Sequence, residues 1–345
     1  MNQRLASPMR STEILASSKR TPTAATGVLL CLAVGALCLL ANHYFNSLSA
    51  LLLAIVLGIV WRNLVSVPQN LDPGIAVSGK SLLRLGIVVM GFQLSLNSIL
   101  SLGPGVLLVV LLSVSVTFLL TAWIGKLLGL ELEQRLLIAF GFSICGAAAV
   151  AGAEGTIKAK EHQVATAVGL VVLFGTLMIP AMPAIAMVLG LDEHGAGMLI
   201  GASTHEVAQV VAAAGSVGSA ALSVAVTVKL ARVLLLAPIV AGVGVYMRTK
   251  HSVHGEKHPP LVPLFIVGFV ATMLLRSTVD LPEAVLHSAS VVQTLLLSSA
   301  MFALGLGVHL RSIFSKSGKT LLLALAATGT IIAVAASGTL LFPPA

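Results

Sequence analysis

The sequence predicts an all-α polytopic membrane protein, and three observations lead to that fold class. Hydrophobic residues make up 57% of the 345 residues and charged residues only 9%, whereas soluble domains carry about 25% charged residues. Long apolar runs follow one another along the chain, bounded by Pro, Gly or charge. No run alternates as a strand does, and helices satisfy the backbone within lipid. The composition therefore argues against a water-soluble fold.

Each of the apolar runs is long enough to be helical in lipid. The runs lie near residues 24–43, 48–66, 74–101, 103–128, 132–157, 163–190, 194–215, 217–247, 260–276, 284–312 and 317–343. Residues 1–23 carry four basic side chains before the first run. This run is longer than a usual signal-peptide core, and no cleavage site follows it closely. We therefore expect 1–23 to be a cytoplasmic tail and 24–345 to form one transmembrane domain.

The basic residues between the runs test the topology. If all eleven runs cross, Lys158 and Lys160 lie outside, against the positive-inside rule. The fifth and seventh runs are weakly hydrophobic and interrupted, by Ser143-Ile-Cys-Gly146 and Ser203-Thr-His-Glu206. If both runs enter and return as re-entrant hairpins, every basic connection obeys the rule. The sequence thus predicts 9–11 transmembrane segments with two broken or re-entrant helices, in a bacterial inner membrane with a cytoplasmic N-terminus.

Internal similarity agrees with this topology. Gly91–Ser101 matches Gly305–Ser315 at five positions, and Gly141–Ala153 matches Gly201–Ala213 at five positions. With the two hairpins, the members of each pair enter the membrane from opposite faces. We interpret them as inverted repeats, and transporters built this way bind their substrate at broken helices near the midplane.

Several motifs that suggest other activities do not fit their context. Gly74–Ser81 satisfies the phosphate-loop pattern G-x-x-x-x-G-K-[ST], but a proline-bounded loop precedes it and a membrane span follows. No Ser-His-Asp or paired-carboxylate arrangement is visible, so we expect no enzyme activity and no cofactor. His251, His254 and His258 lie in a short basic connection that we expect to be solvated, so no metal site is predicted. The net charge of +8 arises from cations at segment ends and indicates no nucleic-acid partner.

The strongest functional signal is Gly201-Ala-Ser-Thr-His-Glu-Val-Ala-Gln209. An ionisable pair inside an apolar run is costly unless it meets partners or water. Glu206 and His205 would couple or gate transport by accepting protons. His205 and Gln209 are four residues apart, so we expect them to share one helical face and to bind a substrate or ion together, with Ser203 and Thr204 beside them. The alternative is that Glu206 pairs with Lys229 or Arg232 and only locks two helices.

Two cations, Lys229 and Arg232, lie three residues apart deep in another apolar run. They would recognise an anion, since a guanidinium matches oxyanions well; alternatively, Lys229 snorkels to the interface. Ser143, Cys145 and Gly146 would let a helix start approach the same ligand, or would only pack closely against another helix. Further polar residues in these runs are regarded mainly as structural: Arg84, Gln93 and His309.

The chain resembles a known family at three strings: Phe140–Ala149, Ser203–Ala212 and Val228–Pro238. It is similar to the YeiH-type sulfate exporter family of bacterial membrane proteins from about residue 25 to the C-terminus. That family usually has Ser-Ile-Cys-Gly-Gly-Ser-Ala, whereas this chain has Ala147 and Ala148 after Gly146, so one hydroxyl is missing. The resemblance implies kinship with cation–proton antiporters and anion transporters, which pair a panel of helices with a core that contains broken helices.

These observations predict a secondary transporter, in the exporting direction, for a small inorganic or organic anion such as sulfate. H⁺ or Na⁺ would be the coupling ion, the lipid bilayer the environment, and a homodimer the expected assembly if the chain is oligomeric. Two alternatives remain open: a cation/proton antiporter of the same fold group, and a membrane sensor or partner protein that transports nothing.

Overall fold

The computed structural model describes residues 24–44, 49–250, 263–308 and 318–344. Within these ranges the only regular structure is helical, as the composition predicted. The predicted tail, 1–23, lies outside the described residues, and so do the three histidines of the 251–262 connection and His309.

Seven helical segments are long and apolar enough to cross a bilayer. They are α1 (Ala24–Tyr44), the run Gln69–Gln93, α6 (Gly103–Leu127), α9 (Glu161–Val188), the run Ser219–Thr249, α15 (Glu283–Gly305) and α17 (Gly318–Leu341). The run Gln69–Gln93 joins η1 (Gln69–Leu71), α3 (Asp72–Val77), η2 (Ser78–Leu82), α4 (Leu83–Met90) and η3 (Gly91–Gln93). The run Ser219–Thr249 lies in α12 (Ser219–Leu234) and α13 (Leu236–Lys250). Two shorter apolar helices are α2 (Ala50–Leu64) and α14 (Leu264–Thr278).

Five shorter helices complete the described chain: α5 (Leu96–Leu100), α7 (Leu132–Ser143), α8 (Ala147–Ile157), α10 (Glu193–Ser203) and α11 (Val207–Gly215). Local sequence signals explain several of their ends. The side chain of Asp192 caps α10 by accepting a hydrogen bond from Gly195 N at 2.8 Å, the usual work of an N-cap residue. Lys158 lies at the C-cap of α8 in the left-handed conformation. This backbone conformation ends the helix, and the chain continues into α9.

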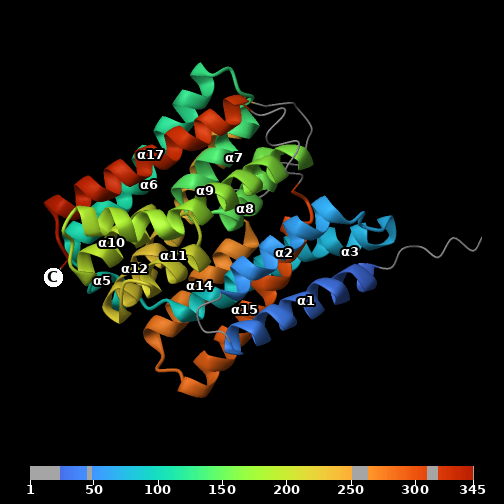
Figure 1. The fold of residues 1–345 in the computed structure, drawn as a ribbon, viewed down its shortest axis with the longest axis horizontal. Helices are drawn as coiled ribbons and strands as arrows, with labels where there is room; N and C mark the ends of the chain where they lie inside the picture. The colour runs from blue at the N-terminus through green and yellow to red at the C-terminus, as the bar shows by residue number, and fades with distance from the viewer. Residues whose placement is uncertain (1–23, 45–48, 251–262, 309–317, 345) are drawn as a thin grey trace, which may run out of the picture.

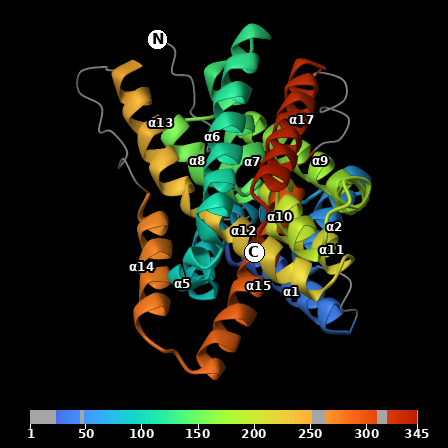
Figure 2. The same cartoon turned by 90° about the vertical axis from the view of Figure 1, so that its left-hand side faces the viewer.

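The helices form two bundles (Figure 1). The first bundle contains α1, α2, α3, α4, α14 and α15, and α15 packs against α1, α2 and α4. The second bundle contains α6 to α12 and α17, and α6 and α17 lie side by side (Figure 2). Close backbone approach holds the first bundle together, because Gly58 of α2 faces Gly305 of α15.

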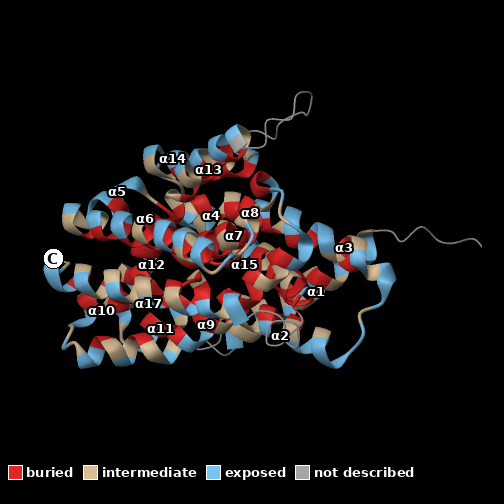
Figure 3. Cartoon of the chain, turned by 90° about the horizontal axis from the view of Figure 1, so that it is seen from above, coloured by how far each residue is buried: buried red, intermediate tan, exposed pale blue. Residues whose placement is uncertain are grey.

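Burial separates an inner and an outer set of helices (Figure 3). Nearly all residues of α7 and α10 are buried, as expected for helices that are enclosed by others. Large apolar side chains are exposed along α1, α6 and α17, for example Leu29, Leu119 and Leu322. Such an exposed apolar surface fits lipid rather than water.

Candidate functional site

Two short helix pairs bring their turns together in the middle of the second bundle. In the pair α7–α8, helix ends at Ser143 and starts again at Ala147; in the pair α10–α11, it ends at Ser203 and starts again at Val207. We call residues 144–146 the first turn and residues 204–206 the second turn. Both serines bond back to the carbonyl four residues earlier, at 2.6 and 2.7 Å.

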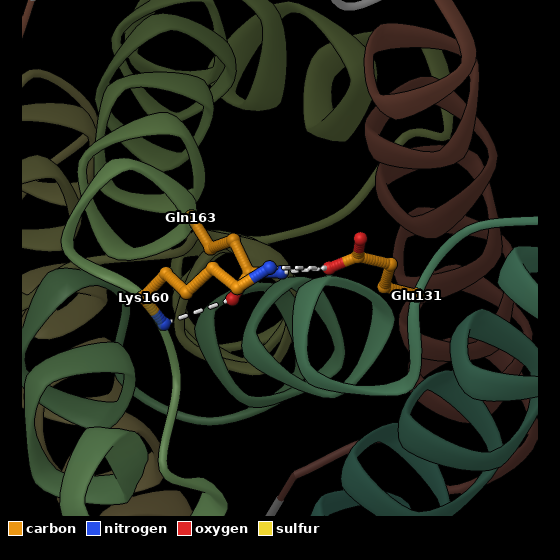
Figure 4. Close-up of polar contacts among 3 residues, drawn as sticks. All are labelled: Glu131, Lys160 and Gln163. Atoms are coloured by element: carbon orange, nitrogen blue, oxygen red, sulfur yellow. Dashed lines mark hydrogen bonds and ion pairs between the residues drawn. The ribbon is translucent and has the colours of Figure 1, made fainter.

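The outer ends of the α7–α8 pair meet at the start of α9 (Figure 4). Glu131, directly before α7, accepts a hydrogen bond from Gln163 Nε2 at 2.7 Å and lies 3.8 Å from Lys160 Nζ. The outer ends of the α10–α11 pair also meet, because Glu193 lies directly against Gly218. The ends of the α7–α8 pair meet at the start of α9, whereas α10 begins just after α9 ends. The two meeting points therefore lie at opposite ends of this 28-residue helix.

Lys229 of α12 ties the two turns together. Its ammonium, fully buried, donates to the Ile144 carbonyl at 2.7 Å, to the Thr204 carbonyl at 2.8 Å and to the His205 carbonyl. These carbonyls follow the ends of α7 and α10, where helices leave carbonyl oxygens without partners and their dipoles favour cations. All three donors of the ammonium are therefore in use.

Arg232 extends the same arrangement by one helical turn. Its guanidinium, also fully buried, donates to the carbonyls of Gly201 and Thr204, each at 2.9 Å, and to the Ser143 carbonyl at 2.8 Å. Neither cation forms an ion pair with Glu206 within 4.0 Å among the described contacts, so the locking salt bridge that was the alternative interpretation is not present there. The alternative of snorkelling is wrong as well, because Lys229 has no exposed surface.

Glu206 bridges the starts of α8 and α11. Its Oε1 accepts a hydrogen bond from Ala147 N at 3.1 Å, and its carboxylate also accepts the backbone N–H of Gln209 in a capping box. The Gln209 side chain accepts a hydrogen bond from Glu206 N at 3.0 Å through Oε1 and donates one to Glu206 Oε2 at 3.3 Å through Nε2. Gly146 allows this approach, because its φ is 78° and any β-carbon there would collide with Glu206.

His205 lies away from Gln209, which corrects the expectation that the two share a helical face. The second turn is not helical, so α11 starts only at Val207 and the four-residue spacing carries no geometric meaning. The His205 imidazole instead lies 3.3 Å from the Thr328 hydroxyl of α17 and 4.5 Å from the Phe142 ring. Gln209 is held by Glu206 and lies against Gly175 of α9.

A cavity of 740 Å³ lies between the two bundles and reaches the turns. Of the predicted site residues, Cys145 and Glu206 line it, together with Ala148. The other predicted residues are not among those that line this cavity: Ser143, Gly146, Ser203, Thr204, His205, Gln209, Lys229 and Arg232. Direct contact between Lys229 and a substrate is therefore not available in this conformation, because its donors are taken by carbonyls.

The first bundle supplies cavity residues that the sequence interpretation missed. Gln293 and Thr294 of α15 line the cavity, and the buried Gln293 Oε1 has no hydrogen-bond partner. The available signal was an amide inside an apolar run, which the sequence shares with Gln93. Gln93 is exposed, and its Nε2 donates a hydrogen bond to the Leu286 carbonyl at 3.4 Å. Arg84 stacks over the Phe265 ring at 5.7 Å.

A second cavity of 450 Å³ lies between the bundles on the side where α9 begins. Lys80 of η2 and Glu154 of α8 line it and form an ion pair of 2.8 Å between the bundles. The segment Gly74–Ser81, which imitates a phosphate loop, is helical in α3 and η2, so no loop is present to cradle a phosphate.

Comparison with known proteins identifies the family. A family model described as "Conserved hypothetical protein 698" matches residues 26–324. A UPF0324 membrane protein of Corynebacterium glutamicum is 49% identical over 316 residues, which cover 91% of this chain and 92% of the relative. The chain belongs to the UPF0324 family of membrane proteins. UPF0324 relatives from Pseudomonas aeruginosa and Bacillus cereus are 41% and 34% identical, covering 81% and 85% of this chain and 82% and 86% of the relatives. UPF0324 membership and the seven apolar helices make it a multi-pass bacterial membrane protein.

Proposed function

We propose that this UPF0324 protein is a secondary transporter of a small anion, and that its two bundles move against each other to expose the site alternately to either side. One observation carries the proposal: the 740 Å³ cavity between the bundles is lined by Cys145 of the first turn and Glu206 of the second. Solute sites in transporters are built at such junctions of interrupted helices. The transport step needs no covalent chemistry.

Two re-entrant hairpins explain the pairs α7–α8 and α10–α11. The contacts of Glu131 with Lys160 and Gln163, and of Glu193 with Gly218, bring the outer ends of each pair together. Each pair therefore returns to the side from which it enters. Seven long and two shorter apolar helices then cross the membrane, which gives nine spans and two hairpins and favours a cytoplasmic N-terminus by the positive-inside rule.

An inverted repeat accounts for the likeness of the two hairpins. Helices α7 and α10 end at Ser143 and Ser203, which bond back to the chain in the same way, and the next helices start at Ala147 and Val207. The corresponding residues are 60 positions apart in both cases, as in the sequence match between Gly141–Ala153 and Gly201–Ala213. The hairpin mouths lie at opposite ends of α9, so the hairpins enter from opposite faces. The second bundle corresponds to the core, and the first to the panel, of the related transporter folds.

A negatively charged solute suits the electrostatics of the turns. Lys229 and Arg232 place two positive charges directly behind them, and α8 and α11 begin there with the positive ends of their dipoles. The resemblance to sulfate exporters suggests sulfate as the solute to test first. An inside-negative potential would drive export, because about 2.3 kcal/mol per charge per 100 mV gives about 4.6 kcal/mol for a dianion.

A second candidate function is cation/proton antiport. The observation in its favour is that the carboxylate of Glu206 lines the cavity, whereas no Lys or Arg does so among its lining residues. A cation would then bind Glu206 in exchange for a proton. The two readings differ in what neutralising Glu206 does: it removes the ligand of a cation, but it leaves the positive charges that attract an anion.

The test is ligand binding by purified protein, followed by flux in proteoliposomes. Thermal shift would be measured with sulfate, sulfonates and carboxylates, and with Na⁺ and K⁺, for the wild type, Glu206→Gln and Glu283→Gln. Glu283 is exposed at the start of α15 and serves as the matched control. Anion stabilisation that survives in Glu206→Gln supports anion transport. Cation stabilisation that is lost only in Glu206→Gln supports antiport, and absence of any solute flux would support a non-transporting protein.

A further inference from the structure

The carboxylate of Glu206 already occupies a position suited to an anion. It lies where α8 and α11 both begin and accepts backbone N–H groups from both helices, at Ala147 and Gln209. Helix starts present unpaired N–H groups and positive partial charge, which is why anions bind there. Glu206 supplies the anion from within the chain.

The same carboxylate also faces the route by which a solute arrives. Glu206 is 7% exposed, and it lines the 740 Å³ cavity together with Cys145. Ala148, Val207 and Ala208, in the first helical turns of α8 and α11, line the same cavity, so a solute anion that enters it meets the Glu206 carboxylate together with the helix starts. Four buried polar atoms of the site residues and the cavity wall have no hydrogen-bond partner among the described residues: the Thr204 hydroxyl, His205 Nδ1, Arg232 Nε and Gln293 Oε1.

A count of charges shows what changes when Glu206 is neutral. The titratable or charged side chains around Glu206 in the described elements are Cys145 of the first turn and Lys229 of α12, which interact with its charge, its chain neighbour His205, and Arg232, which bonds to the Thr204 carbonyl of the same turn. With Glu206 charged, two cations face one carboxylate. With Glu206 protonated, two positive charges remain and two helix starts lose their acceptor, so a monoanion or dianion is the complementary ligand.

We propose that Glu206 is a tethered anion that competes with the transported anion, so that a solute anion binds at the turns only after this carboxylate takes up a proton and withdraws. The inference rests on the proposed function and adds its coupling. One proton from the bulk is bound to a Glu206 oxygen for each anion bound, and both leave on the same side. Sulfate then moves with a net charge of −1, so the membrane potential contributes half as much to its export as it would for the dianion alone. The empty site is refilled by the ionised Glu206, which lets the unloaded protein return.

Neutralising Glu206 should therefore separate binding from coupling. In Glu206→Gln the side chain keeps an oxygen for Ala147 N but carries no charge, so the anion always finds the site free. Anion exchange across the membrane continues in this variant. Net proton-coupled anion flux is lost, because the unloaded site has no internal anion for the return step.

The experiment measures the binding of radiolabelled sulfate and of methanesulfonate, whose charges stay constant near neutral pH, across a pH series. Wild-type affinity should rise as the pH falls, by up to tenfold per unit, as one proton per anion requires. Glu206→Gln should bind sulfate independently of pH, at least as tightly as the wild type in acid, and should retain sulfate exchange without net proton-coupled uptake. The control Glu283→Gln should behave as the wild type.

Three results would overturn the proposal. Wild-type sulfate binding that is independent of pH removes the competition without requiring any variant. Weaker sulfate binding by a folded Glu206→Gln, or binding that keeps its pH slope in that variant, shows that the carboxylate does not compete. Each of these three results is compatible with anion transport itself. Absence of anion binding by the wild type at every pH would instead contradict the proposed function as well.

Discussion

Replacing Lys229 by Met tests whether this lysine holds the two turns together. The substitution leaves the carbonyls of Ile144 and His205 without their only described partner, while Thr204 keeps its bond from Arg232. Two orphaned buried acceptors cost about 2–6 kcal/mol. Hydrogen bonds inside membrane proteins average about 0.6 kcal/mol, so we expect a loss near the lower end, about 2 kcal/mol.

The assay is thermal unfolding of purified protein in detergent, with Lys126→Met as the matched control. Lys126 is exposed in the last turn of α6, so its loss should cost little. A loss of about 2 kcal/mol corresponds to a fall in melting temperature of about 4–8 °C by the scaling for mid-sized proteins. If Lys229→Met melts within about 1 °C of the control, the ammonium does not stabilise the turns and the reasoning fails.

Three further substitutions follow from the cavity and its surroundings. Ala148→Ser adds a hydroxyl to the cavity wall and should strengthen sulfate binding about 5-fold, the equivalent of one net hydrogen bond of ~1 kcal/mol, as measured by equilibrium binding. Gly175→Ala pushes a methyl group into Gln209 and should destabilise the protein by about 1–3 kcal/mol in thermal unfolding. Lys80→Gln breaks the ion pair with Glu154 between the bundles, and since such exposed pairs contribute about 0.2–1 kcal/mol, it should shift the balance between open states about 1.4- to 5-fold.

Each of these changes has its own readout or control. Gly155→Ala is the control for Gly175→Ala, because nothing lies within 4 Å of its added carbon; equal melting temperatures for the two variants would contradict the predicted collision. Labelling of Cys145 is the readout for the Lys80 variant, because this free cysteine lines the 740 Å³ cavity and should react with a membrane-impermeant thiol reagent only in a state that opens the cavity to that side. The labelling would be measured in a background without Cys31 and Cys38. If Lys80→Gln leaves the labelling of Cys145 unchanged, the ion pair between Lys80 and Glu154 does not stabilise one open state over the other.

The sequence predicted the helical fold well, because burial in lipid leaves little choice of backbone structure. The runs 132–157 and 194–215 were the ambiguous ones, and basic residues beyond their ends were needed to interpret them. The structure ends helices at Ser143 and Ser203, where polar residues interrupt the apolar pattern. Such interruptions can be recognised locally, without knowledge of tertiary contacts.

The partners of the buried cations could not be predicted in the same way. Lys229 and Arg232 were recognised as buried, but their partners are backbone carbonyls, which every residue carries and no residue type reveals. When only side chains and ligands are considered as partners of Lys229 and Arg232, the candidates are a bound solute or Glu206. Gln293 lines the cavity because of the way α15 packs. One isolated amide in an apolar run does not indicate that packing.

The bond from Lys229 to the Ile144 carbonyl joins residues 85 positions apart in the chain. A ribosome that adds about 5–20 residues per second needs roughly 4–17 s to cover that interval. Throughout this time the first turn exists without its lysine, and a bare carbonyl in hydrocarbon costs several kcal/mol. We therefore expect the α7–α8 pair to remain in contact with water during biogenesis. It can insert to its final depth only after α12 has been synthesised and packs beside it.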